Sequence, residues 1–175
     1  MKGLWVCFGL VALQIAPASA QTAWQSRDGH VSVTLPEGWE SFDEPGYEFF
    51  SESYIDDKSV ATCEAKAQIY PNASGVVQQA LNRRSAQATA ETVGVSGRVT
   101  RFSNTRMSDG VQIVEFGFEA EEPGSKFEFS IVQFGFVLKQ ELHGYVFSCI
   151  APFPVTMTTR EEILDLLHSI AIERE

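Results

Sequence analysis

Apolar and polar residues alternate in two segments of the first half of the chain, residues 30–35 and 61–69. A period of two is typical of half-buried β-strands. The first segment follows Arg27-Asp28-Gly29, a pattern that favours a tight hairpin turn. Residues 37–57 between the two segments show no clear period. We therefore expect a long loop there, entered through Trp39 packed beneath the sheet.

Two other segments have helical spacing. Ser74 is the expected N-cap of a helix that runs to about Thr92. Near the C-terminus, residues 158–162 hold two overlapping capping boxes. The helix expected after them carries one apolar stripe, formed by Ile163, Leu166, Leu167 and Ile170.

The region between the two helices predicts an antiparallel meander. Its strands are expected over residues 98–106, 111–120, 126–138 and 145–150, separated by turn-forming residues. Runs of strands with helices at their ends are typical of an α+β fold. The pattern thus predicts an antiparallel β-sheet flanked by two main helices.

The first twenty residues have the pattern of a cleavable signal peptide. A positive start at Lys2 precedes an apolar run over residues 4–15, and Ala18-Ser19-Ala20 supplies a cleavage site. The run is too short to span a bilayer, so no transmembrane segment is expected. We expect a mature chain of residues 21–175, folded as a single domain in the periplasm, with an extracellular location as the alternative.

The net charge of the chain bears on the kind of partner it binds, and its cysteines bear on whether it has a disulfide. The chain has a formal net charge of −10, and removal of Lys2 with the signal peptide makes it one unit more negative. This charge argues against nucleic acid as a partner. Cys63 and Cys149 remain after processing, and an oxidising compartment favours a disulfide between them. Two buried thiols or an intermolecular bridge are the alternatives.

Both ends of the expected domain resemble the PsbP-like family. The residues that carry the resemblance are the strand ending in Pro36-Glu37-Gly38-Trp39, and the last strand and helix, Tyr145 to Cys149 and Leu167 to Ile170. The resemblance implies an α/β/α sandwich, an antiparallel sheet between helices. It also implies a role in binding other proteins, and it transfers no catalytic residue.

Motifs for catalysis or metal binding are weak in this sequence. His30, His143 and His168 lack the spacing of a zinc site, and there is no G-x-S-x-G nucleophile elbow. We expect no cofactor, no metal and no catalytic residue. A hydrolase whose triad assembles only in space and a small-ligand-binding protein remain as alternatives.

Two segments are candidate recognition surfaces. Residues 37–57 are rich in acids and aromatics and are either a recognition lip or a packed flap. The second candidate is a basic patch in an acidic chain, which either faces an acidic partner or pairs with the acidic residues of 37–57. The candidate anchors of the first are Tyr47, Phe49, Phe50 and Tyr54, and the basic patch comprises Arg83, Arg84, Arg98, Arg101 and Arg106.

These observations favour a non-catalytic periplasmic protein that binds another protein. Its role would be that of an accessory subunit, an effector chaperone or an immunity protein. We expect a monomer or a weak homodimer.

Overall fold

The computed structural model describes residues 22–71, 82–93, 97–108 and 110–173. The expected signal peptide lies outside these ranges. So does Ser74, the expected start of the first helix.

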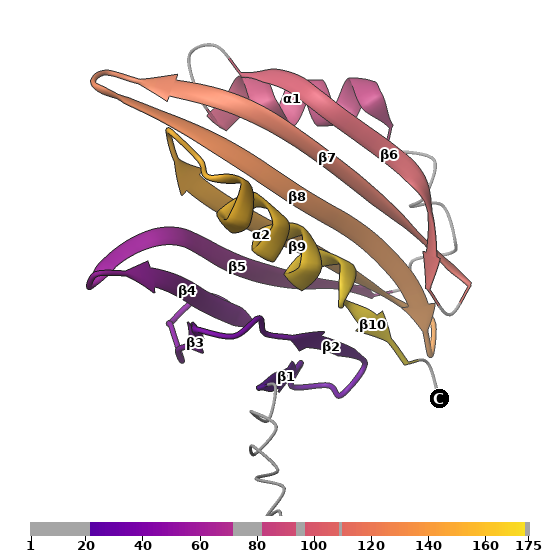
Figure 1. Ribbon diagram of the computed structural model, residues 1–175. Coiled ribbons are helices and arrows are strands. Elements are labelled where there is room, and N and C mark those ends of the chain that lie inside the picture. Colours follow the sequence, from indigo (N-terminus) through magenta and orange to yellow (C-terminus); the bar gives the residue numbers. More distant parts are fainter. Residues whose placement is uncertain (1–21, 72–81, 94–96, 109, 174–175) are drawn as a thin grey trace, which may run out of the picture.

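A seven-stranded antiparallel sheet forms the body of the protein, with the strand order β3-β4-β5-β9-β8-β7-β6 (Figure 1). The predicted meander is confirmed as β6 to β9. The strands are β3 (Trp39–Ser41), β4 (Phe49–Ile55), β5 (Lys58–Pro71), β6 (Arg98–Ser108), β7 (Val111–Glu122), β8 (Ser125–Leu138) and β9 (Glu141–Pro152).

A second, three-stranded sheet contains both ends of the described chain. Its strands β1 (Ala23–Gln25) and β2 (Val31–Thr34) form the predicted hairpin, and β10 (Ala171–Ile172) pairs with β2. Gly29 in the hairpin turn has a φ of +78°, which glycine adopts without steric cost.

Helix α2 (Met157–His168) and the small sheet cover one face of the large sheet. The predicted apolar stripe is confirmed, because Ile163, Leu166, Leu167 and Ile170 are all buried in this layer. The helix begins earlier than expected: Thr156 is the N-cap, and its hydroxyl accepts a hydrogen bond from the amide of Thr159. Trp39 is buried as expected and its indole nitrogen donates to Glu162.

Helix α1 (Arg83–Val93) packs on the opposite face. Ala86 and Ala90 contact a second core around Phe116 and Phe118. Ile113 belongs to the first core and its neighbour Val114 to the second, so the two cores lie on opposite faces of β7. The main contacts of α1 are with β6 and β7 (Figure 1). The expected sandwich of two flanking helices is thus met only in part, and strands dominate the structure.

The predicted disulfide joins β5 to β9. Cys63 and Cys149 are directly opposite each other in the ladder and are bonded, and both are buried. This excludes free thiols and an intermolecular bridge at these positions in the structure described here. It also confirms that these two strands are neighbours in one antiparallel sheet.

Residues 37–57 are not a long loop, and this expectation was wrong. The segment contains two strands, β3 and β4, which pair antiparallel with each other. The buried positions of β4 are Phe49, Ser51 and Ser53. Because two of the three are serines, the alternation of buried and exposed positions leaves no apolar period in the sequence.

Candidate binding site

The edge of β5 is open along part of its length. Pairing with β4 begins at Phe49 opposite Ala65. Strand β5 continues beyond this point to Pro71, and it pairs with β9 from Thr62 to Pro71. Within the described part of the chain, no strand pairs with the outer edge of β5 beyond Ala65. The chain before β4 turns away at Gly46, which has a φ of +94°.

A groove of about 740 Å³ lies at this open edge. Arg27 reaches it from the turn between β1 and β2, and Tyr47 and Glu48 reach it from the segment before β4. The remaining wall is formed by β5, β8 and β9 and includes Ala67, Tyr70, Phe134, Tyr145 and Val146. We call this feature the edge groove.

An aromatic group borders the edge groove. The ring centroid of Phe50 lies 5.8 Å from that of Tyr47 and 6.4 Å from that of Phe42. The ammonium of Lys66 lies 4.8 Å from the centroid of the Tyr47 ring. The charge of Glu64 and its hydrogen bond with the phenol raise the pKa of Tyr47. Rigid aromatic surface beside charged groups is typical of protein recognition sites.

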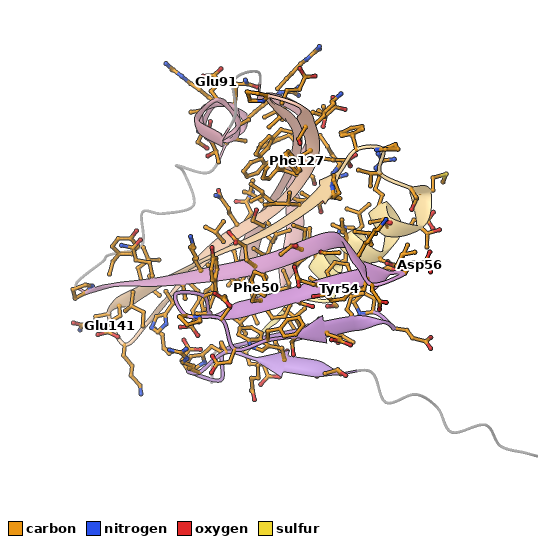
Figure 2. All side chains as sticks on the ribbon, turned by 90° about the vertical axis from the view of Figure 1, so that its left-hand side faces the viewer. Phe50, Tyr54, Asp56, Glu91, Phe127 and Glu141 are labelled. Atoms are coloured by element: carbon orange, nitrogen blue, oxygen red, sulfur yellow. A yellow bond between two sulfur atoms is a disulfide. The ribbon has the colours of Figure 1, made fainter. Side chains whose placement is uncertain are left out.

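The four predicted anchors divide between core and surface. Phe49 is only 2% exposed and packs on Trp24 with a centroid distance of 5.2 Å, so its proposed role as a surface anchor was wrong. Tyr47 and Phe50 are half-buried beside the edge groove. Tyr54 is 40% exposed, hydrogen-bonds to Glu52 and lies farther along β4 (Figure 2).

Phe42 is an aromatic residue of the site that we did not select from the sequence. It is 42% exposed and contacts Phe50. The sequence signal was available, because Phe42 lies in the same acidic and aromatic segment as the chosen anchors.

A polar network anchors the β1–β2 turn at one end of the edge groove. The carboxylate of Asp28 accepts hydrogen bonds from the hydroxyl of Ser26 at 2.6 Å and from that of Tyr145 at 2.8 Å. Its other contacts are the backbone amide of His30 and the His143 ring, whose Nδ1 lies 3.2 Å from Oδ2. Burial raises the pKa of Asp28, but these hydrogen bonds outweigh it and lower the pKa to about 2.

The lowered pKa of Asp28 predicts an acid-dependent contribution to stability. Asp28 should stabilise the fold fully above its ordinary pKa of 3.8, and this contribution should be lost as the pH falls towards 2. We expect Asp28→Asn to lower the melting temperature at pH 7 and to have a much smaller effect at pH 2. Thermal melts at pH 7, 4 and 2 measure this, with Asp43→Asn on the exposed surface as the control. A melting difference independent of pH would contradict the prediction.

The predicted basic patch does not form one surface. Arg101 makes an ion pair of 3.1 Å with Glu115 of β7 and donates to the hydroxyl of Ser130. Glu115 also lies 2.8 Å from Nε2 of His168. One alternative expected from the sequence is that the basic residues pair with the acids of residues 37–57. For Arg101 this is wrong, because its partner Glu115 lies on the adjacent strand β7.

The other arginines of the predicted patch lie around α1 and β6. Arg83 and Arg98 line a hollow of about 630 Å³ together with Glu119 and Glu121, so the charges there are mixed. Arg84 is exposed on α1 beside Arg83. The side chain of Arg106 lies outside the described part of the structure.

Within the described ranges, no helix is long and apolar enough to cross a membrane. In the same ranges, no three His, Cys, Asp or Glu side chains are grouped so that they could hold a metal ion.

The sequence matches no family model and no curated protein. Its fold is nevertheless similar to solved structures. LpqN of Mycobacterium tuberculosis, involved in cell envelope biogenesis, superposes with a TM-score of 0.65 at 10% identity, covering 87% of this chain and 90% of LpqN. The chain spans about half the length of another match, a Bacteroides thetaiotaomicron protein with a TM-score of 0.53 at 13% identity, which covers 89% of this chain.

Two further similar structures have the PsbP/Mog-like fold that the sequence resemblance implies. The cyanobacterial PsbP of Synechocystis has a TM-score of 0.61 at 11% identity, covering 97% of this chain and 99% of that protein. The Ran-binding protein MOG1P of Saccharomyces cerevisiae has a TM-score of 0.57 at 8% identity, covering 88% and 96%. The chain therefore has the PsbP/Mog-like fold.

Proposed function

We propose that this chain is a non-catalytic binding protein of the periplasm that recognises another protein through the edge groove. The observation that carries the proposal is the aromatic group of Phe42, Tyr47 and Phe50 beside an open stretch of sheet edge. A few residues, among which Trp, Tyr and Arg are enriched, supply most of the binding energy in protein interfaces. The roles in which we place it are accessory subunit, effector chaperone or immunity protein.

An exported location is part of this proposal. The disulfide between Cys63 and Cys149 would persist in an oxidising compartment. The expected signal peptide supports the same location. Among the structures with this fold, LpqN is involved in cell envelope biogenesis and MOG1P is Ran-binding.

The volume of the edge groove favours a second candidate function. A hollow of about 740 Å³ lies within the range of about 300–1,000 Å³ found for small-molecule sites. A small apolar ligand would contact Phe134, Val146 and Tyr70. If the groove binds only such a ligand, crosslinking from the groove wall should produce no adduct between this chain and another protein.

Site-specific photocrosslinking in the native envelope tests protein binding at the edge groove. A benzophenone amino acid at Tyr47 or Tyr70, both on the groove wall, should produce a discrete adduct of higher mass. The same amino acid at Glu161, exposed on α2, is the matched control. Adducts that are absent at all three positions, or equal at all three, would contradict protein recognition through the groove.

A further inference from the structure

The backbone at the edge groove is arranged to accept another strand. The amide of Glu48 donates to the carbonyl of Ala65 at 2.9 Å, so the backbone groups of Ala65 point to the outer edge of β5. In a β-strand, the N–H and C=O groups of alternate residues point to the same edge. Ala67 and Ile69 therefore direct their N–H and C=O groups to the open edge. Pro71 directs only its carbonyl there.

Between Lys66 and Pro71 this edge carries two polar side chains, Lys66 and Gln68, and two large exposed side chains that are aliphatic or aromatic. Ile69 is 52% exposed and Tyr70 is 44% exposed. Exposed apolar edge strands are sites at which another strand pairs. Ala67 ends a cross-strand row with Tyr145 and Phe134, and its small side chain leaves part of the groove wall hollow.

We propose that the edge groove binds an extended segment of a partner protein as an added strand, antiparallel to β5 and in line with β4. This inference rests on the proposed function and specifies the kind of partner. The added strand would place one apolar side chain opposite Ala67, where it extends the row of Tyr145 and Phe134, and another opposite Ile69. It would place a polar side chain opposite Gln68 and an aromatic one opposite Tyr70.

The charge of Lys66 favours one orientation of the added strand. The net charge of the whole chain disfavours a second copy of this protein as the partner. Within the described residues, Lys66 lies over Tyr47 but makes no ion pair. An acidic residue at the end of the added strand nearest Lys66 would form an ion pair with it. Glu48 also lines the groove, but its carboxylate is already paired with Arg27 at 3.8 Å. Two mature copies would each carry a formal net charge one unit more negative than the −10 of the full sequence, and the open edge between them is only six residues long.

A synthetic peptide with the core Tyr-Val-Thr-Val-Glu is the probe for this inference. Fluorescence anisotropy should detect its binding to the mature protein, and the amide protons of Ala67 and Ile69 should become slow to exchange. Ile69→Pro should weaken binding about tenfold, because it removes an outward N–H without interrupting the ladder with β9. Ile69→Ala, which keeps the N–H, is the matched control and should bind better than Ile69→Pro.

A second measurement does not depend on the folding of a variant. The same peptide N-methylated at both valines should bind the unaltered protein about tenfold more weakly, because it loses its inward N–H donors. Equal binding of the methylated peptide, no binding of the unmodified peptide, or slow exchange of both amides in the free protein would overturn the inference. A partner adduct from Tyr47 or Tyr70 in the envelope would still support the proposed function in each of these cases.

Discussion

Replacing Cys63 and Cys149 together by alanine is expected to lower the free energy of unfolding by about 4.5 kcal/mol. The bond joins residues 86 positions apart, and closing so long a loop restricts the unfolded chain strongly. For a chain of this length the loss corresponds to a fall in melting temperature of about 10–18 °C. Both side chains are buried, so their truncation adds to the loss.

Denaturant unfolding of the oxidised protein and the double variant measures this effect. The wild-type protein unfolded and refolded in reductant is the matched control, since it lacks the bond but keeps both side chains. It should be almost as unstable as the double variant. A double variant as stable as the oxidised protein would show that the bond between β5 and β9 contributes nothing to the fold.

The second large effect is expected at Phe49. Phe49→Ala should cost about 3–5 kcal/mol, because the ring is buried against Trp24 and Phe147 between the two sheets. Tyr54→Ala removes the ring of a residue that is 40% exposed and should change stability by no more than about 0.5 kcal/mol.

Thermal melts of these two variants compare the loss of stability at a buried position of β4 with that at an exposed position of the same strand. Both residues lie on one strand, so the pair is internally matched. Phe50→Ala, at a half-buried position, should fall between them. A loss of stability at Tyr54 as large as that at Phe49 would contradict the assignment of Tyr54 to the surface.

The meander and the last helix could be predicted because their burial follows a simple period. Ile163, Leu166 and Leu167 recur at helical spacing, and each is buried. The hairpin at Gly29 has a local cause, the positive φ of its turn. The pairing of Cys63 with Cys149 followed from compartment and number of cysteines, with no need of geometry.

The pairing of β3 and β4 could not be predicted, because Ser51 and Ser53 occupy buried positions. Serine side chains are small enough to be buried at these positions, so they replace the apolar residues by which a period is recognised. For the same reason the aromatic residues of this segment could not be divided in advance. Phe49 and Phe50 are neighbours in sequence and point to opposite faces of one strand.

The sequence by itself determined the α+β class, the order of the strands in the meander and the stripe that packs α2 on the sheet, and it favoured the disulfide over its two alternatives. These depend on local periods and on composition. Only the tertiary structure decided where the site lies, because the edge groove exists through a difference in strand length: β4 begins opposite Ala65, while β5 runs on to Pro71. The place at which one strand stops pairing with another depends on contacts between distant parts of the chain, and no local pattern records it.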